Sequence, residues 1–334
     1  MAKLWLKEHR QRSSWYFLLL CFGLIISLIS STTWAAEKLY PNRPINMVIA
    51  YAPGGAADLC SKPVADRMAE LLGQPMISVY KPGGGGSLGA AFVSKARPDG
   101  YTVLLGSSTP LAISPVVEKM DYVLEDFSLI GIFGKGPLWL AVKADARWKT
   151  LKDFVEEAKK SPGKLTVGSY GKLSASHFCI ETFSKYAGIT LNHVPFKSSG
   201  EALTAILGGH IDSALVKGAG GHLESGSIRI LAAATDKRLE WLSDVAIFKE
   251  FGYPVLANQW NSFCVPKATP KEVVDKLINT QKRAFEKYGK EIKEDLKRVE
   301  YWVELYDPQV SMQKFKEERE TALRIAQELG AAVK

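Results

Sequence analysis

Short apolar segments alternate with helical segments along this chain, and most of the apolar segments end in a loop of glycine, serine or threonine. Residues 46–51, 76–80 and 101–105 are apolar runs of strand length. Residues 57–72 and 87–96, which lie between them, have helical spacing of apolar side chains. Strands that alternate with helices at this spacing predict a mostly parallel sheet covered by helices on both faces.

The alternation starts again after residue 143, which predicts a second α/β unit. Residues 127–143 and 260–265 are extended apolar segments that flank this second unit. The expected helices and strands of the second unit and of the chain end are 151–160, 165–168, 176–187, 191–196, 200–207, 211–216, 228–233, 271–287 and 310–329. The pattern predicts an α/β protein with two lobes: residues 36–136 and 260–334 form lobe 1, and residues 137–259 form lobe 2. A cleft between two such lobes is a natural ligand site.

The first 35 residues have the pattern of a signal peptide. Four basic residues precede a 15-residue apolar run, residues 15–29, and small residues at Thr33 and Ala35 predict cleavage before Ala36. A membrane anchor is the alternative, but a bilayer core needs about 20 apolar residues. We therefore expect export of a mature chain of about 299 residues (334 minus 35).

Charge and cysteine content exclude several classes of function. The mature chain has a formal charge of about +5 (39 Lys and Arg minus 34 Asp and Glu), spread among interleaved acids rather than clustered as in a nucleic-acid-binding surface. Cys60, Cys179 and Cys264 have neither zinc-site nor disulfide-framework spacing. We expect buried thiols, although one disulfide would be compatible with the sequence. No metal and no cofactor is expected.

Loops that follow the expected strands carry the chemical signal. Glycine lets the backbone approach a ligand closely, and the first N–H groups of a helix lack internal partners. Several helix N-termini that face one cleft, with serine and threonine hydroxyls beside them, make an anion site without a buried arginine. Such loops occur in both lobes, at residues 53–58, 82–89, 106–109, 168–176 and 197–200.

Two enzyme motifs match the same glycine run. Residues 84–89 fit the dinucleotide pattern Gly-x-Gly-x-x-Gly, but the next strand ends without a ribose-binding acid. Residues 85–89 fit the nucleophile pattern Gly-x-Ser-x-Gly around Ser87. A hydrolase would need a histidine and an acid beside Ser87, and sequence spacing does not reveal such a triad.

Motifs along essentially the whole mature chain resemble the substrate-binding proteins of tripartite tricarboxylate transporters, the TctC or Bug family. These motifs are YPNRPI at 40–45, PGG with Asp58, LGQP at 72–75, PGGGGSLG at 82–89, PDGYT at 98–102, HVPFK at 193–197, ALT at 202–204, LGGHID at 207–212 and PKATPKEVV at 266–274. The resemblance implies a type II-like periplasmic binding fold with mixed sheets flanked by helices, whose lobes close on a small carboxylate. It implies two integral membrane transporter subunits as partners, and no nucleic acid.

The resemblance also assigns ligand-binding residues. It implies that two first-lobe loops hold one carboxylate, partly through ordered water, and that second-lobe loops complete the cleft. The predicted ligand residues are Pro53, Gly54, Gly55, Ala56, Ala57, Asp58, Gly84, Gly85, Gly86, Ser87, Ser107, Ser108, Thr109, Ser169, Ser174, Ser176, Lys197 and Ser198. Lys172 and Lys197 are candidate partners for a second charge, with solvated surface lysines as the alternative interpretation.

The chain departs from the usual family pattern at four places. Ala57 replaces a hydroxyl residue, Gly-Ser-Leu-Gly replaces Gly-Asn-Ile-Gly in the second loop, residues 171–174 contain Lys and Leu, and residues 214–220 lack a proline-containing turn. These changes leave the ligand open among malonate-like, tricarboxylate, amino-acid and aromatic carboxylates.

The sequence therefore predicts a monomeric, non-catalytic solute receptor of the periplasm. Two alternatives remain: a secreted enzyme on the same two-lobe scaffold, and a ligand sensor that docks a signalling protein.

Overall fold

The computed structural model describes residues 39–172, 174–255, 257 and 259–330. The described residues from Arg43 onward belong to one compact unit. The predicted signal peptide, residues 1–35, lies outside the described residues. Across the described part of the chain, no helix is both long enough and apolar enough to span a membrane.

A six-stranded mixed sheet forms the first lobe, in the order β11-β4-β10-β3-β1-β2. β1 is parallel to β2 and β3, as the strand–helix alternation predicts. β10 is antiparallel to β3 and β4, and β11 is antiparallel to β4. The sheet is therefore mixed. Its strands are β1 (Ile45–Ile49), β2 (Met76–Tyr80), β3 (Thr102–Ser107), β4 (Phe127–Gly136), β10 (Gln259–Pro266) and β11 (Trp302–Val303).

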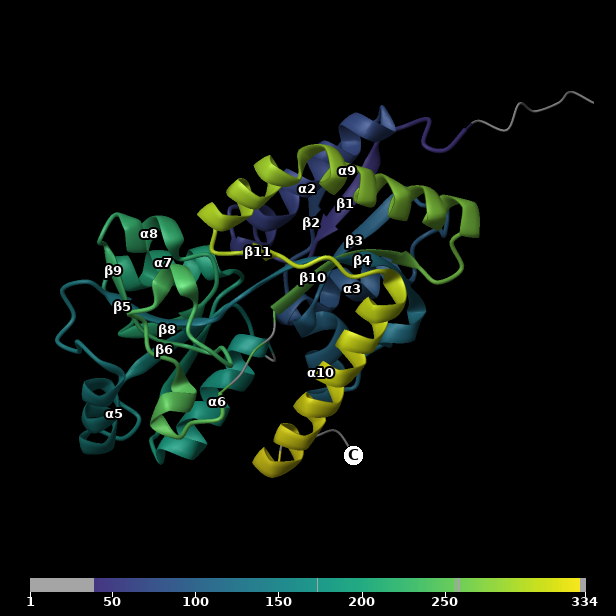
Figure 1. Ribbon diagram of the computed structural model, residues 1–334. Helices are drawn as coiled ribbons and strands as arrows, with labels where there is room; N and C mark the ends of the chain where they lie inside the picture. The colour runs from purple at the N-terminus through teal and green to yellow at the C-terminus, as the bar shows by residue number, and fades with distance from the viewer. Residues whose placement is uncertain (1–38, 173, 256, 258, 331–334) are drawn as a thin grey trace, which may run out of the picture. The chain divides into compact units, whose positions relative to one another are not determined.

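Helices cover both faces of this sheet (Figure 1). α2 and α9 pack against each other on one face, whereas α3 and α10 lie on the other. Phe315 of α10 joins Val48, Leu104 and Phe127 in the core between α10 and the strands. The helices of this lobe are α2 (Ala56–Leu72), α3 (Ser87–Ser94), α4 (Ser114–Val117), α9 (Lys271–Arg298) and α10 (Pro308–Leu329).

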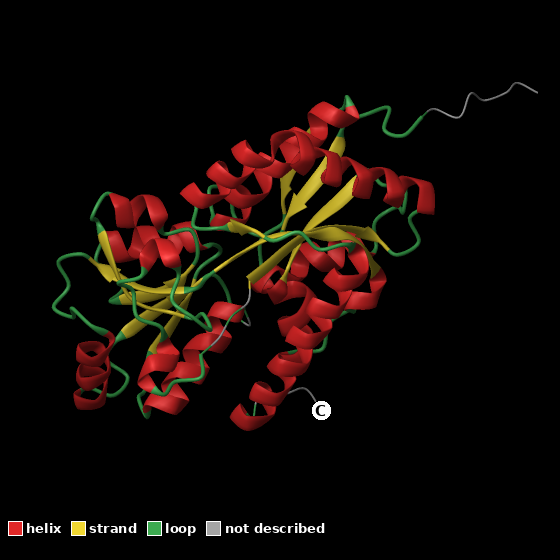
Figure 2. Ribbon diagram, viewed as in Figure 1, coloured by secondary structure: helices red, strands yellow, loops and turns green. Residues whose placement is uncertain are grey.

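A five-stranded mixed sheet, β7-β6-β8-β5-β9, forms the second lobe. Trp139, Ala141, Leu203 and Val216 belong to the core between this sheet and α7. Figure 2 shows the helices on both sides of the strands. The elements are β5 (Trp139–Lys143), α5 (Leu151–Lys160), β6 (Thr166–Ser169), α6 (Ala175–Ala187), β7 (Asn192–Pro195), α7 (Ser199–Leu207), β8 (Ser213–Val216), α8 (Gly220–Glu224) and β9 (Ile228–Ala233).

The chain crosses between the two sheets twice, once between β4 and β5 and once between β9 and β10. The crossings are hydrogen-bonded to each other, since Ala234 N donates to Leu138 O at 2.9 Å. Within the second crossing, Ala257 N donates to Ala234 O at 3.1 Å. These contacts place two adjacent strands of chain at the hinge. The α/β class, the mixed sheets and the two-lobe arrangement are confirmed.

Local sequence signals explain where several helices begin and end. α5 begins with a capping box in which Thr150 Oγ1 accepts from Asp153 N, and the Asp153 carboxylate accepts from Thr150 N. α2 ends at Gly73, whose φ of +67° suits glycine. α9 extends beyond the predicted end at residue 287, to Arg298, through a non-helical φ/ψ at Tyr288. Cys60, Cys179 and Cys264 are buried thiols, as expected.

Candidate functional site

Loops from both lobes meet at a small cavity beside the N-terminus of α2. The cavity has a volume of about 10 Å³, which is about the room that one water molecule needs. A larger ligand therefore enters only when the two lobes separate. The cavity is lined by Tyr51, Gly55, Ala56 and Ala57 from the first lobe and by Tyr170, Ser198, Ser199 and Lys217 from the second.

The N-terminus of α2 supplies polar groups to this cavity. Gly55 is the N-cap and offers no side chain to the first N–H groups of the helix, which also lack intrahelical partners. The approach from the second lobe is close, because a Cβ on Gly55 would lie 3.1 Å from the Ser198 Cβ. This end of α2 is therefore a positively polarised surface that a carboxylate can reach once the lobes separate.

Two buried tyrosines form the polar wall of the cavity. The rings of Tyr51 and Tyr170 meet edge to face, with centroids 5.8 Å apart. Tyr51 Oη donates to Gly85 O at 2.9 Å, and Tyr170 Oη donates to Gln259 Oε1 at 3.0 Å. Burial raises the pKa of Tyr51 to about 12, so its hydroxyl remains protonated at neutral pH. Tyr170 of the second lobe is therefore bonded to the hinge strand β10, and Tyr51 contacts its ring from the first lobe.

Lys217 brings a positive charge into the same cavity. It directly follows β8 and is only 3% exposed. Its Nζ donates to Gln259 Oε1 at 3.4 Å and lies 5.0 Å from the Tyr170 ring centroid. Burial lowers the pKa of Lys217 to about 8, while Cys60 and Glu318 act in the opposite direction. The lysine is therefore mostly charged at neutral pH.

Asp58, in the first turn of α2, stabilises the loop that precedes it. Its Oδ2 accepts from Gly54 N at 3.0 Å and from Tyr80 Oη at 3.1 Å. Pro53 and Gly54 are exposed at the tip of this loop. The 53–58 loop thus combines an outer turn fixed by Asp58 with an inner face, residues 55–57, on the cavity.

The second glycine loop has a different position. A Cβ on Gly85 would lie 3.1 Å from Ser174 Cα and 3.2 Å from Lys172 O, so this glycine touches second-lobe backbone directly. Ser87 Oγ donates to Gly84 O at 2.8 Å, and a Cβ on Gly86 would lie 2.9 Å from Tyr51 Oη. Gly85 therefore packs against the second lobe beside the cavity, and residues 84–87 are not among its lining residues.

The predicted hydroxyls at the end of β3 are buried and bonded within the structure. Ser107 Oγ lies 3.3 Å from Tyr51 Oη, and Ser108 Oγ accepts from Trp260 N at 2.9 Å. Thr109 Oγ1 accepts from Ala175 N at 3.1 Å. These three residues form a polar layer next to the cavity that reaches both the hinge and the start of α6.

The predicted second-lobe residues separate into three groups. Ser198 lines the cavity and caps α7 by accepting from Glu201 N at 3.2 Å. Ser174 caps α6, and Ser176 Oγ donates to Leu215 O. Lys197 has an exposed side chain, as does Lys172. Neither of these exposed lysines lines the cavity, and Lys217 is the charged residue among the described residues that do.

Ser169 is bound to a histidine outside the cavity lining. Its Oγ lies 2.7 Å from His193 Nε2 and also donates to Gly171 O at 3.0 Å. His193 stacks on His177 with ring centroids 4.0 Å apart. Burial is the main cause that lowers the pKa of His193 to about 4. A neutral His193 in this position fixes the 169–171 turn, and no described histidine hydrogen-bonds to Ser87.

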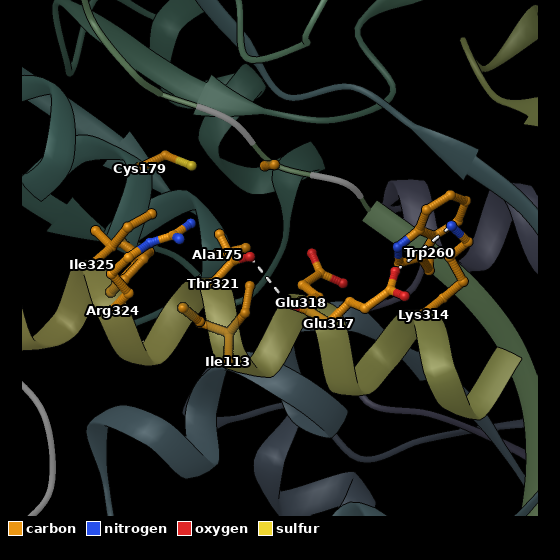
Figure 3. A pocket seen from close by; sticks show the side chains of 13 residues that line it. Ile113, Ala175, Cys179, Trp260, Lys314, Glu317, Glu318, Thr321, Arg324 and Ile325 are labelled. Carbon is orange, nitrogen blue, oxygen red and sulfur yellow. Dashed lines mark hydrogen bonds and ion pairs between the residues drawn. The ribbon is translucent and has the colours of Figure 1, made fainter. Parts of the chain in front are cut away.

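A second, larger cavity of about 350 Å³ lies between α10, the start of α6 and β10. Figure 3 shows the Glu318 carboxyl group pointing from α10 into this space, with Lys314 on one side and Arg324 on the other. Burial raises the pKa of Glu318 to about 8. Within the described part of the chain, its Oε2 is buried and has no hydrogen-bond partner.

Four residues that line the cavity were not predicted from the sequence: Tyr51, Tyr170, Ser199 and Lys217. A signal for Lys217 is present in the sequence, because a lysine directly follows the apolar run Ala214-Leu-Val216 at the end of a buried strand. A charged side chain at the end of a buried strand therefore indicates the edge of the sheet, as glycine and serine do.

Comparison with known proteins agrees with this geometry. The family model described as tripartite tricarboxylate transporter family receptor, TctC, matches residues 60–331. The "UPF0065 protein in gbd 5'region" of Cupriavidus necator is 32% identical over 263 residues, which are 78% of this chain and 80% of the relative.

Solved structures have the same fold. Periplasmic binding protein BugD matches with a TM-score of 0.83 and 27% identity, over 88% of this chain and 99% of that one. MatC from Rhodopseudomonas palustris with bound malate matches with a TM-score of 0.80 and 25% identity, over 86% and 99%. The family is one of substrate-binding receptors and not a class of enzymes. This chain belongs to the tripartite tricarboxylate transporter receptor family, TctC.

Proposed function

We propose that this chain is a periplasmic solute-binding protein that captures a small carboxylate between its lobes for a tripartite tricarboxylate-type transporter. The observation that carries the proposal is the cavity where the N-terminus of α2 meets Lys217 and Ser198 of the second lobe. An anion placed there would accept hydrogen bonds from first-lobe N–H groups and neutralise a second-lobe ammonium. The malate in MatC supports a carboxylate as the ligand class.

Ligand capture would follow from the hinge. With the lobes apart, the 53–58 loop would offer its N–H groups to a carboxylate from solution. The second lobe would then rotate about the two crossings and enclose the ligand, as in hinge closure of other two-lobed receptors. Ser198 would then lie in close contact with Gly55.

The rest of the assignment follows from the same proposal. Residues 1–35 would be a signal peptide that is removed on export to the periplasm. Lobe 1 would comprise residues 36–136 and 260–334, and lobe 2 residues 137–259. The loaded receptor, a monomer without catalytic residues, would dock on two integral membrane subunits.

A thermal-shift screen tests the function. The protein from Ala36 onward, refolded once to remove bound ligand, is heated with malate, adipate, citrate, aspartate and benzoate and with the matching amides. Binding to the native state raises the melting temperature by mass action. We expect a shift with one or a few acids and none with their amides. The absence of a shift with every acid would contradict the proposed function.

A further inference from the structure

Lys217 forms no salt bridge with the described residues, although the buried Glu318 favours its charge from beyond salt-bridge distance. Its Nζ has a neutral amide oxygen, Gln259 Oε1, at 3.4 Å and the face of Tyr170 at 5.0 Å. None of the ion pairs among residues 39–330 that the structure describes includes Lys217. Burying an ammonium group without an acidic partner costs free energy. The fold therefore keeps a destabilising charge at this point.

Lys217 and the start of α2 face the same small space. Gly218, which follows the lysine, is so close to α2 that a Cβ on it would lie 3.0 Å from the Ala56 Cβ. The backbone of Lys217 is fixed by its own N–H, which donates to Ser199 Oγ at 3.2 Å. A helix N-terminus and an ammonium group both favour negative charge, so a single anion between them stabilises both.

We propose that Lys217 is the counter-ion of the ligand carboxylate, and that it makes closure of the lobes depend on the ligand's negative charge. This inference rests on the proposed function and specifies it. The N-terminus of α2 belongs to the first lobe and Lys217 to the second, so the ion pair forms only when the lobes are together. The ligand is then an acid with a free carboxylate, and this carboxylate contacts Lys217 and the N-terminus of α2 directly.

A matched control is available in Lys135. This lysine is partly buried, its Nζ lies 3.0 Å from Glu304 Oε1, and it also stacks on Trp260 at 4.8 Å. Both lysines contact aromatic rings, but Lys135 has an acidic partner and does not line the cavity at α2. Replacing each by methionine keeps the length of the side chain and removes the charge.

The experiment measures two quantities for the wild type, Lys217→Met and Lys135→Met: the melting temperature without ligand, and the dissociation constants of malate, adipate and benzoate by calorimetry. Lys217→Met should raise the ligand-free melting temperature, because it removes an unpaired buried charge. Lys217→Met should also raise the dissociation constant of the acid that binds the wild type by at least about 30-fold, since one partner of a buried charge pair is lost. Lys135→Met should lower the melting temperature and leave the dissociation constant within about threefold, the scale of additive effects at distant sites.

The outcomes separate the two proposals. If no acid binds the wild type, the proposed function fails. If an acid binds the wild type and Lys217→Met equally well, the role of Lys217 is wrong while the receptor function stands. A lower ligand-free melting temperature in Lys217→Met would indicate a structural lysine and overturn the inference. Should Lys217→Met not fold, Lys217→Gln replaces it, and Lys217→Arg must retain more affinity than Lys217→Gln.

Discussion

Residues 53–58 and residues 82–89 both connect a strand of the first sheet to a helix, and both are rich in glycine. In the first loop, Gly55 leaves the N-terminus of α2 open to the cavity. In the second, Gly85 lies against the backbone of residues 172–174 of the other lobe. The same residue type thus exposes donors to a ligand in one loop and permits close contact between lobes in the other.

After Lys217→Met, the substitution with the largest expected effect on carboxylate affinity lies in the second of these loops. Gly85→Ala adds a Cβ that would lie 3.1 Å from Ser174 Cα, closer than an ordinary van der Waals contact with second-lobe backbone. Overpacking of this kind costs about 1–3 kcal/mol and here acts on the closed form. We expect carboxylate affinity to fall about 5- to 150-fold, as measured by calorimetry.

Gly73→Ala is the control for that variant. Gly73 has a φ of +67°, close to the +63° of Gly85, but a Cβ there meets no atom within 4 Å. Both variants should lose similar stability from backbone strain, about 1–2 kcal/mol. Equal affinities of Gly85→Ala and Gly73→Ala would mean that the second loop does not govern closure.

The pH dependence of carboxylate affinity tests the contribution of Lys217 in the second lobe. The ligand-free pKa of Lys217 is about 8, so carboxylate affinity should be steady below pH 7 and fall up to about tenfold per pH unit above 8. The contribution of Lys217 to folding stability should change with pH in the opposite direction. Between pH 8 and the ordinary lysine pKa the unfolded chain binds more protons, so this group adds stability as the pH rises.

Glu318 is the control for the pH experiment, because its pKa is also raised to about 8. The other titratable groups that face Lys217 do not interfere: burial raises the pKa of Tyr51 and Cys60 to about 12 and the pKa of Tyr170 well above its usual value. Binding titrations from pH 6 to 9.5 should keep the decline in Glu318→Gln, beginning at lower pH because Glu318 supports the charge of Lys217, and should show no decline in Lys217→Met. If the decline were lost in Glu318→Gln and retained in Lys217→Met, the pH dependence would belong to Glu318, and the role of Lys217 would be contradicted.

A smaller effect is expected at the cap of α7. Ser198→Ala removes a helix cap and a cavity hydroxyl. Thr150→Ala removes a comparable cap, on α5. Each should cost about 1 kcal/mol of unfolding free energy in urea titrations. Ser198→Ala should in addition weaken the ligand about fivefold, the effect of one lost hydrogen bond. An unchanged affinity would remove Ser198 from the site.

Most of the fold could be predicted because its signals are local. β2 and α5 have the predicted bounds, and α6 begins within one residue of its prediction. The antiparallel pairing of β10 with β3 and β4 could not be read from the alternation, because that pairing joins segments more than 100 residues apart. The break at Tyr288 likewise left the second half of α9 unpredicted.

The site was less accessible to sequence reasoning. Glycine and serine after a strand mark the edge of a sheet, so residues 55–57 and Ser198 could be expected near a cleft. Which loop would touch the other lobe depends on tertiary distances, such as that from Gly85 to Ser174. Lys217 was not predicted, because a lysine after an apolar strand indicates a position at the edge of the sheet but does not show whether the side chain is buried.

The most direct test is a crystal structure with the acid that gives the largest thermal shift. We predict that its carboxylate lies within hydrogen-bonding distance of Lys217 Nζ and of an N–H group in the first turn of α2. A ligand seated instead in the larger cavity beside Glu318, or one whose carboxylate points into solvent, would contradict this account.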